Sequence, residues 1–246
     1  MCESCGQPGL THGQTMSRRT VLSLGGVVVA MLATGGLAQA ADDKPPPKPE
    51  NVLTPDQALA RLVEGNNRYV QGVAKRHDFI AEREALVGGQ NPFAGILGCA
   101  DSRIAPEYAF DTARGDLFVV RVAGNFLNLD NLASFEYAVE VLKTPLLLVL
   151  GHEACGAVKS TISSIQDKTT LPGHLPSLVA SLTPAVTAAT GRPGNLLENA
   201  IEENVRLNVE KLRTATPLLN AAVSAGRVKV VGGVYRLGSG QVDLIG

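Results

Sequence analysis

The stretch Leu146-Leu147-Leu148-Val149-Leu150-Gly151-His152-Glu153-Ala154-Cys155-Gly156 decides the fold class of this chain. It opens with an uninterrupted apolar run, whereas a strand with one face in water alternates apolar and polar residues. A strand that is apolar on both sides must be covered on both sides, as in a parallel sheet between two layers of helices. The stretch therefore predicts an α/β fold.

Further apolar runs have the same character, and segments with helical periodicity separate them. The runs span residues 93–98, 117–122 and 228–234. The helical segments span residues 132–142, 157–165, 178–189 and 196–212. Because crossovers between parallel strands are right-handed, this order predicts a central, mostly parallel β-sheet flanked by helices. The loops after the strands then gather at one edge, where ligand sites of open α/β sheets lie.

The segment ahead of these strands begins with a helix start signal. Thr54 is a typical N-cap, Pro55 suits the first helical position, and Gln57 completes a capping box. The pattern predicts an amphipathic helix whose apolar face must pack against another part of the protein. We expect its apolar face to comprise Leu59, Leu62, Val63 and Val70.

Three regions organise the chain. We assign residues 1–40 to a signal peptide, residues 41–51 to a proline-rich linker of extended conformation, and residues 52–246 to a catalytic domain. The 246 residues are 45% hydrophobic and 18% charged, with a formal net charge of -1. This balance excludes a nucleic-acid-binding protein or one attracted to anionic lipids, because both need a basic surface.

The signal peptide has the pattern of the twin-arginine export route. Ser17-Arg18-Arg19 precedes an apolar run that ends in Ala38-Gln39-Ala40. Glycines dilute the run, so we expect cleavage after Ala40, with a retained membrane anchor as the alternative. The expected destination is the periplasm, or a thylakoid lumen or another extracytoplasmic space.

Cysteine and histidine side chains directly follow two of the predicted strands. Cys99 comes after the first strand, and His152 and Cys155 come after the third. If these strands are neighbours, two thiols and one imidazole converge on one point. This soft donor set favours one zinc ion and leaves a fourth position for water, whose pKa zinc lowers to about 7. The alternative is that all three are ordinary core residues.

Asp101 and Arg103 follow closely after Cys99. Arg103 is near enough to hold the Asp101 carboxylate through two parallel hydrogen bonds, which favour the ionised carboxylate. Such a carboxylate can accept a hydrogen bond from zinc-bound hydroxide and orient it. If the pair breaks, Asp101 can become a fourth zinc ligand and close the site. The alternative is a surface ion pair of little energetic value.

Four motifs carry a resemblance to a known family. They are CADSR at 99–103, RVAGN at 121–125, SFEYAV at 134–139 and GHEACGA at 151–157. In order and spacing the chain resembles the β-class carbonic anhydrases over roughly residues 52–235. The resemblance implies zinc-dependent hydration of carbon dioxide to bicarbonate. It also implies a homodimer or larger even oligomer, with N-terminal helices that cross onto the partner.

The resemblance also implies a role for each matching residue. Cys99, His152 and Cys155 would bind zinc, and Asp101 with Arg103 would form the catalytic dyad. Substrate contacts would come from Gln90, through hydrogen bonds, and from the backbone N–H of Gly156, which would face the bound anion. Apolar cleft residues supplied by a partner subunit would be Phe118, Ala123 and Tyr137.

Two departures from the family pattern affect the expected site. Ala123 replaces a larger valine and loosens the apolar pocket. Ile96 stands where members with a regulatory bicarbonate pocket carry tryptophan, and the chain contains no tryptophan. We therefore expect the open form near neutral pH. Two other functions stay open at this point: a zinc hydrolase of carbon disulfide or carbonyl sulfide on the same fold, or a non-catalytic, zinc-stabilised scaffold.

Overall fold

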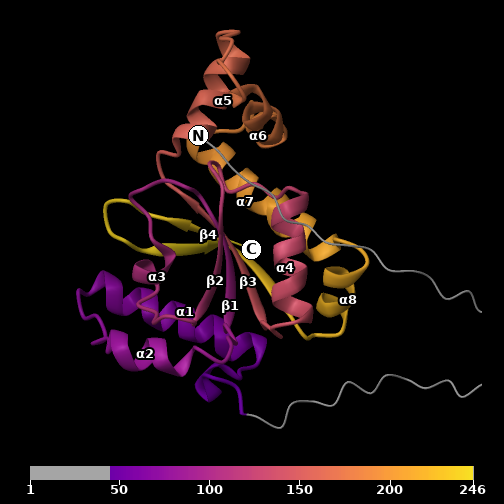
Figure 1. Ribbon diagram of the computed structural model, residues 1–246. Coiled ribbons are helices and arrows are strands. Elements are labelled where there is room, and N and C mark those ends of the chain that lie inside the picture. Colours follow the sequence, from indigo (N-terminus) through magenta and orange to yellow (C-terminus); the bar gives the residue numbers. More distant parts are fainter. Residues whose placement is uncertain (1–44, 246) are drawn as a thin grey trace, which may run out of the picture. The chain divides into compact units, whose positions relative to one another are not determined.

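The computed structural model describes residues 45–245; the predicted signal peptide and the first part of the predicted linker lie outside the described residues. Within residues 45–245, five strands form one sheet in the order β2-β1-β3-β4-β5 (Figure 1). The strands are β1 Ala94–Gly98, β2 Leu117–Arg121, β3 Leu146–His152, β4 Lys229–Tyr235 and β5 Val242–Ile245.

The central strands pair in parallel, as the sequence predicts. β1 pairs with both β2 and β3, and the register aligns Gly98 with Leu150. β3 also pairs in parallel with β4, whereas β5 is antiparallel to β4. Asp243 interrupts the apolar residues of β5, so this strand lacks the apolar run that marks the other strands. The predicted α/β class with a mostly parallel sheet is confirmed.

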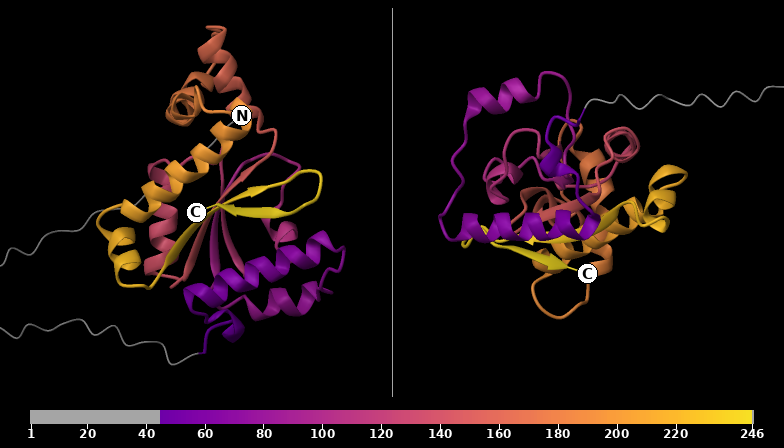
Figure 2. Two further views of the ribbon diagram at one scale, coloured as in Figure 1. Left: turned by 180° about the vertical axis from the view of Figure 1, so that it is seen from behind. Right: turned by 90° about the horizontal axis from the view of Figure 1, so that it is seen from below.

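Helices cover both faces of this sheet (Figure 1, Figure 2). On one face lie α4 Leu129–Glu140, α7 Leu196–Thr214 and α8 Leu218–Ser224, with α5 Gly156–Gln166 and α6 Leu175–Ala189 beyond the strand ends. On the other side lie α1 Pro55–Val70, α2 Phe79–Ala85 and α3 Pro106–Ala109. Among residues 45–245, no helix has the length and hydropathy that a membrane crossing requires.

Alternate residues of β3 pack into the two layers. Leu147 and Val149 belong to the core formed with α4 to α8. Leu146, Leu148 and Leu150 belong to the core formed with α1 and α3. All five side chains are buried, which is what a strand of period two between two helix layers requires.

Helix α1 begins with the predicted capping box. The predicted apolar face is wrong in part, because Leu62 is buried whereas Val63 and Val70 are exposed. Gly65 explains the difference. A Cβ atom at this position would lie 1.9 Å from the carbonyl oxygen of Phe110, so the bare backbone of α1 packs directly on the domain. Hydrophobic periodicity does not reveal such a contact.

The buried residues of α1 are covered by this chain itself. Ala58 and Leu62 lie in the same core as Leu148 of β3, so the buried stripe of α1 packs on this chain. Helix α2 was not expected from the sequence and has no buried residue. Its Phe79 and Ile80 are exposed. A crossing of N-terminal helices onto a partner stays a prediction.

Part of the predicted linker packs against the domain. Pro49–Asn51 forms a 3₁₀ turn, and the Asn51 side chain is buried. The Lys48 ammonium pairs with the buried carboxylate of Asp116. The packed region therefore begins before the expected boundary at residue 52.

Candidate metal centre

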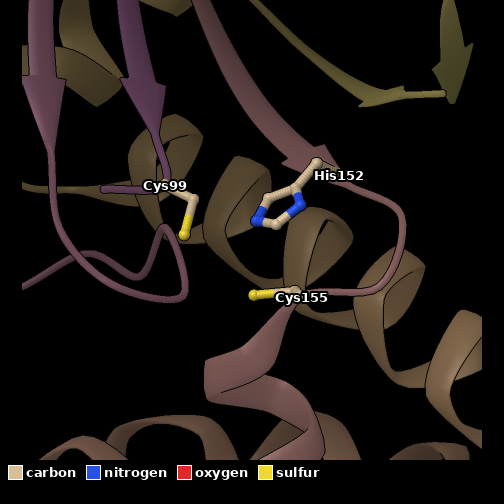
Figure 3. A group of neighbouring side chains, drawn as sticks. All are labelled: Cys99, His152 and Cys155. Carbon is tan, nitrogen blue, oxygen red and sulfur yellow. The ribbon is translucent and has the colours of Figure 1, made fainter. Parts of the chain in front are cut away.

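Cys99, His152 and Cys155 meet at the carboxyl edge of the parallel strands (Figure 3). Cys99 follows β1, His152 is the last residue of β3, and Cys155 is the N-cap of α5. Because β1 and β3 are neighbours, one ligand atom from each residue lies within 4.8 Å of the others. All three residues are buried.

The imidazole of His152 has one satisfied and one unsatisfied nitrogen. Nδ1 lies 2.8 Å from the carbonyl oxygen of Glu153, which only accepts, so Nδ1 carries the proton. Nε2 is buried and has no hydrogen-bond partner among the described residues. Buried polar atoms are normally paired, and a histidine that donates from one nitrogen binds metals through the other. This nitrogen therefore fits a metal ligand.

The surroundings of the two sulfur atoms favour a thiolate at Cys99 and a neutral thiol at Cys155. The pKa of Cys99 lies well below its usual value, chiefly because the Cys155 thiol donates a hydrogen bond to its sulfur. The Gly124 N–H adds a hydrogen bond of 3.3 Å to the same sulfur. The pKa of Cys155 is raised by the same contact and by burial. A cation at this point would stabilise both sulfurs as thiolates, so the donors fit a soft metal such as zinc.

Asp101 lies beside the ligands as an ionised carboxylate. Arg103 donates from Nε to Oδ1 at 2.9 Å and from Nη2 to Oδ2 at 2.7 Å, and its backbone N–H also reaches Oδ1. These bonds hold the pKa of Asp101 well below its usual range. Oδ2 lies 3.9 Å from Nε2 of His152. An anionic hydrogen-bond acceptor therefore stands next to the ligand atoms.

Arg121, at the end of β2, was given no role in the sequence analysis. Its Nε donates to the carbonyl of Cys99 at 2.9 Å. Its Nη2 donates to the carbonyls of Asp101 and Ile104 at 2.7 and 2.8 Å. One guanidinium thus fixes the backbone of the whole loop after β1. The RVAGN motif at 121–125, which begins with Arg121, was the sequence signal that could have indicated this role.

Glu153 was also left without a function. Its carboxylate accepts the Leu237 N–H at 2.8 Å and pairs with Arg236 at 3.3 Å. Arg236 in turn donates to Asp243 at 2.6 Å. The side chain therefore ties the loop after β3 to the connection between β4 and β5, while its carbonyl holds His152. No sequence signal indicates these distant partners.

Two of the predicted substrate residues lie next to the ligands. Ala123 was expected to act from a partner subunit, yet within this chain it directly precedes Gly124, whose N–H contacts Cys99. Gly156 is the first residue of α5 and directly follows Cys155. Its exposed backbone therefore stands at a helix N-terminus, where N–H groups and the helix dipole favour anions.

The other predicted substrate residues are not brought to the ligands within this chain. Gln90 lies ahead of the amino end of β1, whereas Cys99 lies beyond its carboxyl end. Phe118 is near the start of β2, and its ring centroid lies 6.4 Å from that of Tyr137 on α4. Their expected contacts with substrate stay predictions.

The fold and the donor set define a class. Two thiols and one imidazole at the carboxyl edge of an α/β sheet form a soft, three-donor centre, which is typical of catalytic zinc sites with one open position. A structural site would supply a fourth side chain.

Comparisons with known proteins identify the family. A family profile described as carbonic anhydrase matches residues 94–242. The chain is 37% identical over 191 residues to a carbonic anhydrase of Mycolicibacterium smegmatis, covering 77% of this chain and 93% of that protein. Carbonic anhydrase 2 of Mycobacterium tuberculosis is 36% identical, at 77% and 92% coverage. A Coccomyxa β-carbonic anhydrase in complex with acetazolamide superposes with a TM-score of 0.61 at 28% identity, at 76% and 86% coverage. The chain therefore belongs to the β-class carbonic anhydrases.

Proposed function

We propose that this enzyme hydrates carbon dioxide reversibly to bicarbonate and a proton, with one zinc ion held by Cys99, His152 and Cys155. The observation that carries the proposal is the buried, unpartnered Nε2 of His152 beside two thiols. The names of the relatives support the reaction. A zinc ion bound there would supply a nucleophile from water at neutral pH and stabilise negative charge on oxygen.

In the proposed reaction, the protein's side chains orient the reacting oxygen and keep the Asp101 carboxylate ionised. Asp101 accepts a hydrogen bond from the reacting oxygen and so turns its lone pair toward the substrate carbon. Arg103 keeps the carboxylate ionised and occupies both of its oxygens, which holds Asp101 away from the metal. We therefore propose the open form near neutral pH. The Gly156 N–H at the start of α5 would donate to the bicarbonate oxygen.

A direct test is stopped-flow hydration of carbon dioxide by the purified mature chain, with its zinc content assayed. Wild-type enzyme should hydrate rapidly with one zinc per chain. Asp101→Ala should keep its zinc and lose activity by about a hundredfold or more, the usual cost of removing one positioned hydrogen-bonding group. Stoichiometric zinc without hydration between pH 6.5 and 9 would contradict the proposed reaction.

We also propose that the active unit is at least a homodimer. Gln90, Phe118 and Tyr137 would reach the metal of the partner, since they do not reach their own. The surface around them supports this, because Leu129 of α4 is 83% exposed and Tyr137 is 46% exposed. β2 is also an edge strand without a fully buried residue.

Analytical ultracentrifugation tests the homodimer with one charged substitution. Leu129→Asp should shift the enzyme toward a monomer and reduce hydration, while zinc stays bound. Charge reversal at exposed Asp130, as Asp130→Lys, serves as a control for a surface change on the same helix. A wild-type monomer with full activity would contradict the proposal.

Export by the twin-arginine route is proposed on the pattern of residues 17–40. Replacement of both arginines, Arg18→Lys together with Arg19→Lys, should leave the precursor in the cytoplasm. Cell fractionation with an antibody measures this, and a second exported protein controls for lysis. Wild-type protein confined to the cytoplasmic fraction would exclude the route.

A further inference from the structure

Two buried asparagines on α7 face the loop that follows β2. Asn204 and Asn208 are 2% and 1% exposed. Burial of a primary amide is costly unless its donors and acceptor are paired. An apolar side chain at either position would pack there without needing any hydrogen-bond partner. Their hydrogen bonds therefore indicate what they hold in place.

The two amides hold both ends of one turn. Asn204 Nδ2 donates to the carbonyl of Gly124 at 2.8 Å. Asn208 Oδ1 accepts the Leu127 N–H at 2.8 Å. Asn208 Nδ2 donates to Oδ1 of Asn204 at 3.0 Å and to its carbonyl at 2.7 Å. The pair is fully connected, so neither amide can rotate without breaking several bonds.

The residue held by Asn204 is the one that contacts a metal ligand. Gly124 donates its N–H to Cys99 Sγ at 3.3 Å. Its φ of +85° favours glycine, and a Cβ atom there would lie 2.8 Å from Leu182 of α6. Gly124 is therefore confined by α6 on one side and by Asn204 on its carbonyl. Its N–H has little freedom to leave the sulfur.

We propose that Asn204, supported by Asn208, is a positioning residue for the metal. It fixes Gly124, and through the Gly124 N–H it fixes the position of the Cys99 sulfur. Outer-shell hydrogen bonds of this kind orient metal ligands and adjust their donor strength. The inference rests on the proposed zinc site, but it is independent of whether the bound metal hydrates carbon dioxide.

Asn66 of α1 provides a matched control. It is 5% exposed, and its Nδ2 donates to the carbonyls of Ala109 and Gly240 at 2.8 and 2.9 Å. Its Oδ1 accepts the Val242 N–H at 2.9 Å. Asn66 thus has three buried bonds to remote backbone, where Asn204 has one, but it lies on α1, in the other helix layer, and contacts no metal ligand.

The experiment compares Asn204→Leu and Asn204→Asp with Asn66→Leu and Asn66→Asp in the full mature chain. Asn204→Asp keeps the shape of the side chain but as a carboxylate only accepts hydrogen bonds, so it loses the bond to the Gly124 carbonyl and remains informative if Asn204→Leu does not fold. Zinc affinity is measured by chelator competition. Protein substituted with Co²⁺ reports the sulfur-to-metal charge-transfer band, which a loss of stability alone does not shift.

We expect the Asn204 variants to raise the zinc dissociation constant about tenfold and to move the charge-transfer band. The Asn66 variants should change the dissociation constant less than about twofold and leave the band in place. Equal effects at the two positions, or an unchanged band in both Asn204 variants, would overturn the inference. Wild-type enzyme that binds zinc tightly but does not hydrate carbon dioxide would refute the proposed function and leave this result standing.

Discussion

The loop after β1 and the loop after β3 each bring a buried thiol to the same point, yet different contacts hold them. The first loop is fixed by charged groups close to it: Arg103 holds Asp101, and Arg121 of the neighbouring strand holds the backbone. The second loop is fixed by Glu153, whose partners Arg236 and Leu237 lie far along the chain.

This difference predicts different roles for the two loops. The Arg103 side chain is half exposed, so its contact with Asp101 can change without any disturbance of the core. Glu153 instead anchors His152 to the connection that follows β4, and a change there disturbs both the ligand and the sheet edge. Substitutions in the first loop should therefore affect turnover, whereas those in the second should affect metal binding and stability together.

The largest effect is expected at the two cysteines, because each loop contributes one thiol to the proposed metal site. Cys99→Ser and Cys155→Ser should each raise the zinc dissociation constant by more than about a hundredfold, because even outer-shell changes cost about 10–100-fold. Chelator competition measures this, and circular dichroism confirms that each variant is folded. A small effect from either one alone would show that the loops do not share one metal.

A substitution in the first loop should separate turnover from binding. Arg103→Lys keeps the charge but cannot donate two parallel hydrogen bonds, so the Asp101 carboxylate loses its fixed orientation. Hydration should fall by about tenfold or more at saturating carbon dioxide, with zinc content unchanged. Zinc lost in parallel with activity would mean that the first loop also supports the metal.

Glu153→Ala should have the opposite profile. It leaves the Leu237 N–H without its acceptor and removes one of the two carboxylates that pair with Arg236, which should lower the free energy of unfolding by about 1–2 kcal/mol. Zinc affinity should fall in the same variant. Urea unfolding of the zinc-free protein measures the first effect separately. Glu153→Gln, which can still accept the Leu237 N–H, should recover part of both losses.

The smallest effect is expected at Tyr69, which reaches Glu153 only through Tyr235. The Tyr69 hydroxyl lies 3.2 Å from that of Tyr235, whose backbone carbonyl accepts the Glu153 N–H. Tyr69→Phe should cost about 1 kcal/mol and leave zinc affinity unchanged. Because burial, together with the Tyr69 contact, raises the pKa of Tyr235 to about 12, the loss should be constant from pH 6 to 9. A variation with pH in that range would assign the hydroxyls a different role.

The same two loops show what a sequence can predict. Asp101 and Arg103 stand two residues apart, so their pairing follows from local geometry. The convergence of Cys99 with His152 follows from strand order, because both residues end apolar runs. Glu153 and Arg236 are distant in sequence, and only the folded chain shows their contact. Local contacts were therefore predictable, whereas the adjacency of β1 and β3 was only a condition of the predicted site, and distant side-chain contacts had no signal.

Three of the elements missed by the sequence analysis share a physical reason, whereas α8 was missed although it buries Leu219 and Ala222. β5 has no fully buried residue and α2 buries nothing, so neither has a strong hydrophobic period. Helix α3 is only four residues long. Asn204 and Asn208 lie inside a helix that was predicted, but their polarity gave no indication of burial. Periodicity detects apolar contacts and misses polar ones.

The strand order β2-β1-β3 has a consequence for the order in which the protein folds. Cys99 and His152 end adjacent strands, but all of β2 and α4 lies between them in the chain. Such non-local parallel pairing forms slowly, whereas helices form early. A metal ion can join these ligands only after β1 and β3 have aligned. During refolding, we expect zinc to bind later than the far-ultraviolet circular dichroism signal of the helices appears. The rate of zinc binding would then report when β1 and β3 pair.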